Sequence, residues 1–209
     1  MYRFLALFFL LSVVTFAETL QEDENPFSIR LGAGYAEQND LNNILSFNFS
    51  GYEKKTSAIN LDGGWRVAHN AYGSPFDVYL KGGLSYFNEN GYADNFIEGT
   101  LYIKVYGKID FWGNRVRVGF GEGLSLAEQV PISEIDDAYI EDGPNEPTAK
   151  FLNYLDISVD FDLGRLIRVN SLKDLYIGYT IKHRSGVKGI YSGVRGGSNY
   201  LMLTFEKNL

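Results

Sequence analysis

Apolar and polar residues alternate with period two along most of this chain. The pattern is clear in the last third, where Leu175, Ile177, Tyr179 and Ile181 are each separated by one residue. Successive side chains on a strand point to opposite faces, so this alternation predicts a β-strand with one apolar face. The stretch 201–205 repeats the pattern and predicts a second strand after a glycine-rich turn.

Seven further runs with the same alternation come earlier in the chain. Their apolar positions span 27–35, 45–49, 59–67, 76–86, 97–109, 116–124 and 155–163. Turn-like segments rich in glycine, asparagine and charged residues separate most of the runs. No helical period of any length competes with this pattern, so the chain is predicted to be all-β.

The chemistry of the two faces decides between two kinds of barrel. Charged residues recur on the polar face of nearly every run, whereas the other face carries isoleucine, leucine, valine and phenylalanine. A soluble secreted barrel would bury the apolar face, whereas a membrane barrel turns it toward lipid and keeps a polar lumen. Runs of about ten residues favour the membrane barrel, because a tilted membrane strand needs that length. Aromatic residues near the ends of runs favour it too, as membrane-interface anchors: Tyr35, Tyr52, Trp65, Tyr86, Tyr106 and Trp112.

The amino terminus has the form of a secretory signal over residues 1–17. Arg3 supplies the positive start, an apolar run follows, and Ala17 ends a plausible cleavage site. The apolar run is too short for a membrane helix. We therefore expect an exported chain with a polar arm at 18–26 and a small transmembrane antiparallel β-barrel at 27–209 in the outer membrane.

The number of strands follows from a parity argument. Nine alternating runs are visible, but single-chain bacterial barrels have even strand numbers with both termini on the periplasmic side. We expect eight or ten strands, with a further strand hidden in 126–149 beside a long acidic loop. Counting back from a periplasmic carboxyl terminus places the end of the run 175–185 on the extracellular side.

Composition excludes several classes of function. Aspartate and glutamate outnumber lysine and arginine by 26 to 19, which argues against nucleic acid as a partner. The chain has no cysteine, so it forms neither a disulfide nor a thiolate metal site. We expect no cofactor and no metal. The acidic run 134–146 could bind a divalent cation, but a solvated loop is the simpler interpretation.

Three glycines alternate on the polar face of one run, at Gly119, Gly121 and Gly123. No helix is predicted after them, so they do not indicate a nucleotide-binding loop. We expect them to make room in a narrow lumen for bulky side chains such as Tyr102 and Tyr154.

A candidate catalytic set lies at the end of the chain. His183 and Ser185 share one strand face, about 6.5 to 7 Å apart from Cα to Cα, so the imidazole can reach the hydroxyl. A serine becomes a good nucleophile when a base removes its proton, and the base needs a third group to orient it. Asn199 is the candidate for that group, because the last strand should pair with the strand that carries His183. Backbone N–H groups around Gly186 could form an oxyanion hole.

Each of these residues also has a purely structural interpretation. His183 could be a polar residue at the membrane interface, Ser185 could begin a turn, and Asn199 could open the last strand. Glu122 falls on an apolar face, where a charge is costly, and is the reserve candidate for the acid. His69 lies in a turn without an obvious partner, and we interpret it as a solvated residue.

The His-x-Ser pair at the end of the penultimate run resembles the outer-membrane lipid A deacylases of the PagL type. Those enzymes are small barrels with this pair on the lipid-facing surface, and they release an acyl chain from the 3-position of lipid A. The resemblance covers mainly the last third of the chain and implies Ser185 as nucleophile and His183 as base. That family has a glutamate on the last strand, where this chain has Asn199, and often an asparagine where this chain has Gly186. The Ser-His-Asn set also resembles outer-membrane phospholipase A, a larger and calcium-dependent barrel.

The leading hypothesis is therefore a lipid acyl-ester hydrolase whose substrate is lipid A or a phospholipid of the outer leaflet. The sequence leaves open whether the barrel forms a homodimer. The alternative is a non-enzymatic barrel, either structural or for surface interactions. A small porin ranks last, because side chains fill the lumen of a barrel with eight to ten strands.

Overall fold

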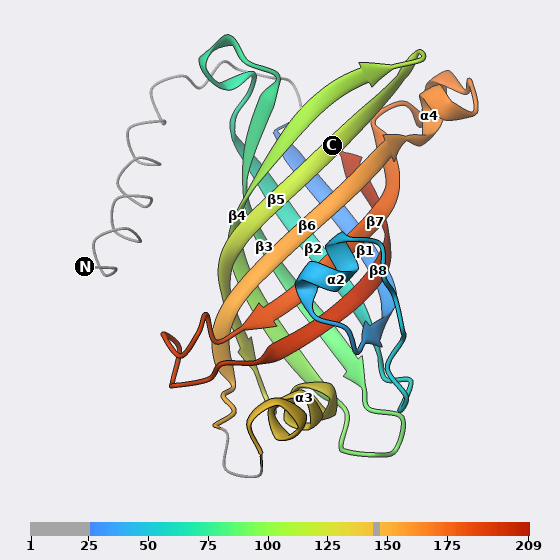
Figure 1. The fold of residues 1–209 in the computed structure, drawn as a ribbon. Helices are drawn as coiled ribbons and strands as arrows, with labels where there is room; N and C mark the ends of the chain where they lie inside the picture. Colours follow the sequence, from blue (N-terminus) through green and yellow to red (C-terminus); the bar gives the residue numbers. More distant parts are fainter. Residues whose placement is uncertain (1–25, 144–146) are drawn as a thin grey trace.

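The chain forms a closed barrel of eight antiparallel strands in a computed structural model that describes residues 26–143 and 147–209 (Figure 1). The strands are β1 Phe27–Glu37, β2 Ser57–Ala68, β3 Phe76–Asn88, β4 Phe96–Phe111, β5 Asn114–Ala127, β6 Phe151–Asp162, β7 Leu175–Ser185 and β8 Gly197–Asn208. Each strand pairs with its neighbours in sequence, and β8 closes the barrel against β1. The predicted signal segment and nearly all of the polar arm lie outside the described residues.

The barrel has an apolar outside and a charged inside. On neighbouring strands, Leu31 and Leu61 are about half exposed, whereas Arg30 and Asp62 are buried in the lumen. In water, such a barrel would expose a belt of apolar side chains, whereas in a membrane the same belt contacts lipid. The strands also pair in a closed ring, so the backbone polar groups are satisfied within the barrel, as a membrane requires. The chain is therefore a small transmembrane antiparallel β-barrel, as its alternation predicts. In the described part of the chain, no helix is long and apolar enough to cross a membrane.

The lumen is filled by buried ion pairs and tyrosine rings. Asp156 is fully buried and accepts hydrogen bonds from Arg30 and Lys104, while Glu206 pairs with Lys81 at 2.7 Å and with Arg117 at 3.3 Å. These contacts compensate the charges that the narrow lumen takes out of water.

The glycines of β5 make the predicted room for this packing. A Cβ built on Gly121 would lie 2.9 Å from a ring carbon of Tyr102, and one on Gly119 would lie 2.8 Å from a ring carbon of Tyr106. The rings of Tyr102 and Tyr154 in turn meet edge to face, with their centroids 5.0 Å apart. The expectation for the glycines is confirmed at Tyr102.

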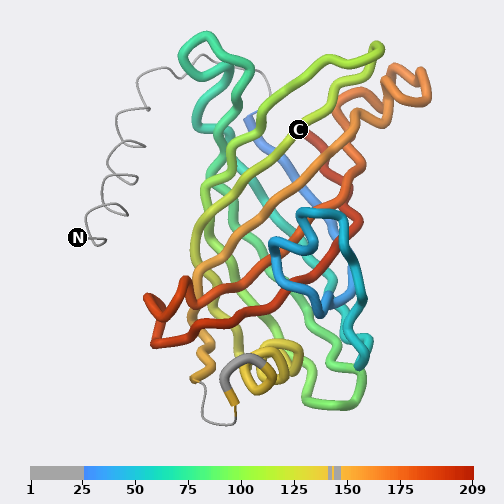
Figure 2. Tube along the Cα trace, viewed as in Figure 1, coloured from blue at the N-terminus to red at the C-terminus, as the bar shows by residue number. Residues whose placement is uncertain are grey.

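The predicted strand at 45–49 is wrong. β1 pairs directly with β2, with Tyr35 opposite Ser57, so the residues between them have no place in the sheet. They form a loop outside the strands that contains the short helix α2, Leu41–Leu45 (Figure 2). Phe47 has a φ of +61°, which no extended strand adopts. Removing this run from the nine leaves an even number, eight.

The strand expected within 126–149 is also absent from the described residues there. β5 already ends at Ala127, and helix α3 forms at Ile132–Asp142. Pro131 precedes the helix, Glu134 lies in its first turn, and Gly143 follows it with a φ of +90°, which are common features of helix ends. Part of the predicted acidic loop is therefore helical.

Two of the predicted interface aromatics face the protein interior. Tyr106 is fully buried in the lumen and Tyr52 is buried in the loop between β1 and β2. Tyr35, Trp65 and Tyr86 do lie exposed on the outer wall, as expected. The aromatic pattern alone could not separate these cases, because tyrosine suits both a wet interface and a hydrogen-bonded lumen.

The two ends of the barrel differ. Ser28 pairs with Asn208, so the start of β1 and the end of β8 lie at the same rim of the barrel. The β4–β5 turn and the short helix α4, Leu163–Leu166, lie at this end too (Figure 1). The opposite rim, which we call the distal end, carries the described parts of four connections: 38–56, 89–95, 128–143 with 147–150, and 186–196. Helix α3 lies across the distal end (Figure 1).

Candidate functional site

The three predicted residues lie on the outer wall at the distal end, and two of them are in contact. His183 on β7 lies directly opposite Asn199 on β8, and Ser185 is the last residue of β7. All three continue the outward-facing positions of their strands, because the lumen-facing residues alternate with them. Ring atom Nδ1 of His183 and Oδ1 of Asn199 are 2.7 Å apart. The structure therefore brings the histidine and the asparagine into direct contact.

A backbone carbonyl fixes the direction of this contact. The Nδ2 group of Asn199 donates to the carbonyl oxygen of Asn39 at 3.1 Å. A carbonyl can only accept, so the amide nitrogen must face Asn39 and the amide oxygen must face His183. Nδ1 of His183 then carries the proton and donates it to Asn199. The other ring nitrogen, Nε2, is then unprotonated, which is the tautomer that a general base needs.

Ser185 is held by the turn that follows it. Its Oγ accepts a hydrogen bond from the N–H of Val187 at 3.1 Å. Among the described residues, no hydrogen bond joins this hydroxyl to the His183 ring. The contact with Val187 uses a lone pair of the oxygen and leaves the hydroxyl proton available for donation. The Gly186 N–H, expected to face an oxyanion, donates to the carbonyl of Gly196 at 3.2 Å.

The residue between the histidine and the serine anchors the strand from the lumen side. Arg184 is fully buried, and its guanidinium lies 3.2 Å from Glu134 on α3 and 3.4 Å from Glu98 on β4. It also donates to the carbonyl of Ala149 at 3.1 Å. Since neighbouring side chains on a strand point to opposite faces, the contacts of Arg184 position the backbone that carries His183 and Ser185.

Burial changes the ionisation of Glu134 on helix α3 at the distal end. It is 1% exposed, and this burial raises its pKa to about 7, although Arg184 acts in the opposite direction. The folded barrel therefore binds a proton that the unfolded chain releases near pH 4.5. Ionisation of Glu134 should lower the free energy of unfolding as the pH rises from about 4.5 to about 7, by up to about 3 kcal/mol.

This pH dependence can be tested with one substitution. Glu134→Gln keeps the shape of the side chain and removes its charge, so the variant should lose less stability than the wild type between pH 5 and pH 8. Urea unfolding in detergent micelles at several pH values measures the difference. Glu53→Gln, at an exposed position of the same end, is the control and should retain the wild-type slope. Parallel slopes for Glu134→Gln and the wild type would contradict the prediction.

The other residues considered from the sequence lie away from the pair. Glu122 is exposed on the outer wall of β5, and Leu155 of β6 lies between it and His183 in the register. It is therefore two strands from the ring. His69 lies at the end of the barrel opposite the site, where its Nδ1 is 2.9 Å from Asp77, so this turn residue does have a partner.

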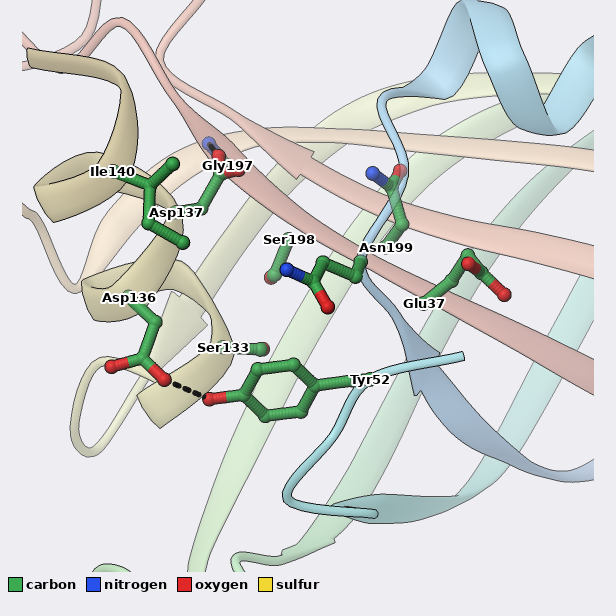
Figure 3. A pocket seen from close by; sticks show the side chains of 10 residues that line it. Glu37, Tyr52, Ser133, Asp136, Asp137, Ile140, Gly197, Ser198 and Asn199 are labelled. Carbon is green, nitrogen blue, oxygen red and sulfur yellow. Dashed lines mark hydrogen bonds between the residues drawn. The ribbon is translucent and has the colours of Figure 1, made fainter. Parts of the chain in front are cut away.

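A small pocket opens beside Asn199 (Figure 3). Asn199 and Glu37 border one side of it, and Asp136, Asp137 and Ile140 of α3 border the other. The hydroxyl of Tyr52 crosses toward α3 and bonds to Asp136, as the dashed line shows. Neither His183 nor Ser185 lines this pocket, so its contents would contact the site through Asn199 alone.

The acidic run on α3 is used in structural contacts. Glu134 binds Arg184, and Asp136 pairs with Lys54 at 2.6 Å. Within residues 26–143 and 147–209, no group of three or more histidine, aspartate and glutamate side chains is arranged to hold a metal ion.

Sequence reasoning missed the contribution of the loop between β1 and β2. The Asn39 carbonyl orients Asn199, and Glu37 lies opposite Asn199 in the pairing of β1 with β8. One signal was available, because Glu37 continues the outward face of Phe27 to Tyr35 with a carboxylate. The role of the Asn39 carbonyl carries no side-chain signature and could not be predicted.

Comparison with known proteins supports the class of fold. The chain matches no family model and no curated protein. Among solved structures, it is similar to the crystal structure of the outer membrane enzyme PagL, with a TM-score of 0.56 and 9% identity over 87% of this chain and 99% of that one. It also aligns with Neisserial surface protein A (NspA), with a TM-score of 0.48 and 10% identity over 88% of this chain and 97% of that one. The likeness to PagL shows a shared fold of small barrels.

Proposed function

We propose that this protein is an outer-membrane lipid acyl-ester hydrolase, most like a lipid A 3-O-deacylase. The observation that carries the proposal is the contact of His183 with Asn199 on the outer wall, with Ser185 two residues further along the same strand. The hydrogen bond from Asn199 to Asn39 selects the tautomer in which Nε2 of His183 can accept a proton. The fold shared with an outer membrane enzyme supports the location.

In the proposed reaction, Ser185 Oγ attacks the ester carbonyl of a lipid while His183 Nε2 takes its proton. The tetrahedral intermediate expels the alcohol, which receives that proton from His183, and leaves an acyl-serine. Water, deprotonated by the same nitrogen, then releases the fatty acid and regenerates the hydroxyl. The outward position suits such a substrate, because the bilayer can deliver an ester laterally without a deep cleft.

Asn199 sets the character of this site. A neutral amide orients the histidine but stabilises the imidazolium less than a carboxylate would. We therefore expect a slower enzyme than one with an acidic third residue at the same place.

The proposal is tested by mass spectrometry of lipid A and phospholipids from Gram-negative cells. Cells that express the wild-type chain are compared with cells that carry the empty vector and cells that express the double variant His183→Ala/Ser185→Ala. Loss of one 3-linked acyl chain from lipid A in the wild type alone is the expected result. Lysophospholipid instead would assign a phospholipase. Identical lipids in all three, with the barrel folded in the outer membrane, would overturn the proposal.

One observation favours a second function, a non-enzymatic surface barrel. Ser185 Oγ and the Gly186 N–H both have partners within their own turn, and the ion pairs of the lumen plug the barrel. A barrel with this arrangement could be purely structural. Unchanged lipids in the experiment above would favour this alternative.

A further inference from the structure

The loop between β1 and β2 is attached to the barrel rim at one carboxylate. Oε1 of Glu37 accepts hydrogen bonds from the backbone N–H of Ser50 at 2.7 Å, the Ser50 hydroxyl at 3.0 Å and the N–H of Gly51 at 2.8 Å. It also lies 3.5 Å from the N–H of Asn39. The carboxylate therefore joins the beginning of the loop to its end.

This carboxylate is built into the structure and is not a solvated charge. Glu37 is only 7% exposed, on the outward face of β1. A buried carboxylate is costly unless donors surround it, and here backbone groups of the loop supply most of them. A second hydrogen bond holds the loop together, since the side chain of Asn39 donates to the carbonyl of Asn48 at 2.9 Å. Asn39 is thus held through its backbone N–H, near Glu37, and through its side chain, bonded to Asn48.

The position of Asn39 matters because its carbonyl is the acceptor for Asn199. Without this acceptor, the amide of Asn199 could rotate by half a turn and offer its NH₂ group to His183. Nδ1 of His183 would then have to accept, so the proton would move to Nε2, and the ring could no longer act as a base toward Ser185. The contact at 3.1 Å between Asn199 and Asn39 prevents this exchange.

We infer that Glu37 is a positioning residue for the His183–Asn199 pair. It acts through the loop, by holding the Asn39 carbonyl where it fixes the orientation of the Asn199 amide and hence the tautomer of His183. The consequence for catalysis rests on the proposed function, whereas the consequence for the tautomer does not. Glu37 itself touches neither the histidine nor the serine in any hydrogen bond of the described residues.

The test reads the protonation of the histidine ring directly. The mature barrel is labelled with ¹⁵N-histidine, refolded in detergent micelles, and its ring nitrogens are observed by NMR. His183 and His69 are the two histidines of the chain, so His69 at the opposite end serves as an internal reference. In the wild type, His183 should carry its proton on Nδ1. In Glu37→Ala, a substantial fraction of His183 should carry it on Nε2.

Activity gives a second readout with a matched control. Glu37→Ala should lower kcat roughly 10- to 100-fold with little change in KM, since it misorients a group without removing it. Glu37→Gln keeps an acceptor oxygen for the same N–H groups and should restore most of both properties. Glu122→Ala removes another outward-facing carboxylate, two strands from His183, and should change neither.

The outcomes separate this inference from the proposed function. A wild-type barrel without hydrolytic activity would overturn the proposed function, and a tautomer shift in Glu37→Ala would still support the positioning role. A His183 tautomer that is the same in the wild type and in Glu37→Ala would overturn the inference, as would an equal shift in Glu122→Ala. If Glu37→Ala fails to fold, Ser50→Ala removes one donor from the same contact, and it should shift the tautomer less but in the same direction.

Discussion

Ser185→Ala and His183→Ala should each reduce lipid ester hydrolysis by roughly 10³- to 10⁶-fold, and the double variant should lose no more than either single one. The reason is that the two residues perform one step together. Without the hydroxyl, the base has no proton to take, and without the base the hydroxyl is a poor nucleophile. If the two residues acted independently, the rate loss of the double variant would instead be the product of the two single losses.

The measurement is kcat/KM for release of fatty acid from lipid A and from phospholipid in mixed micelles. A difference in gel mobility between unheated and heated samples shows that each variant is folded. The chain supplies matched controls, because His69→Ala and Ser171→Ala remove the same side chains from turns at the opposite end of the barrel, and both should keep wild-type rates. Substantial activity in His183→Ala, or losses that multiply in the double variant, would contradict the shared step.

The largest expected effect on stability is that of Asp156→Ala. Asp156 is fully buried in the lumen and accepts hydrogen bonds from Arg30 and Lys104, and from the Tyr154 hydroxyl at 3.1 Å. Removing it leaves two buried cations near each other with one fewer counter-charge. Breaking a buried ion pair from one side costs about 3 to 5 kcal/mol. We expect a loss of that size in the free energy of unfolding.

Urea unfolding of the refolded barrel in micelles measures this loss. Asp110→Ala is the matched control, since Asp110 also pairs with a cation, Arg115 at 2.8 Å, but lies exposed at the end of β4. An exposed pair contributes about 1 kcal/mol or less. Comparable losses for Asp156→Ala and Asp110→Ala would mean that water reaches the lumen and screens its charges.

The limits of sequence reasoning can be seen in the run at 45–49. Its alternation is as regular as that of 155–163, yet the first lies in a loop and the second is strand β6. Period two shows only that a segment could present two faces. Whether it joins the sheet depends on which neighbours pair with it, and β2 occupies the position next to β1. Helix α3 was also missed, and one of the contacts that attach it to the barrel, between Glu134 and Arg184, joins residues that are far apart in sequence.

The amino-acid pattern was enough to predict the all-β class, the inverted arrangement of apolar and charged faces, and the shared outward face of His183 and Ser185. These are local properties, because each follows from the alternation of side chains along one strand. The exact strand count, the direct hydrogen bond between His183 and Asn199, and the hydrogen bond from Asn199 to the Asn39 carbonyl became known from the folded barrel. Those features join residues that closure of the barrel brings together, and a backbone carbonyl leaves no trace in the identity of its residue.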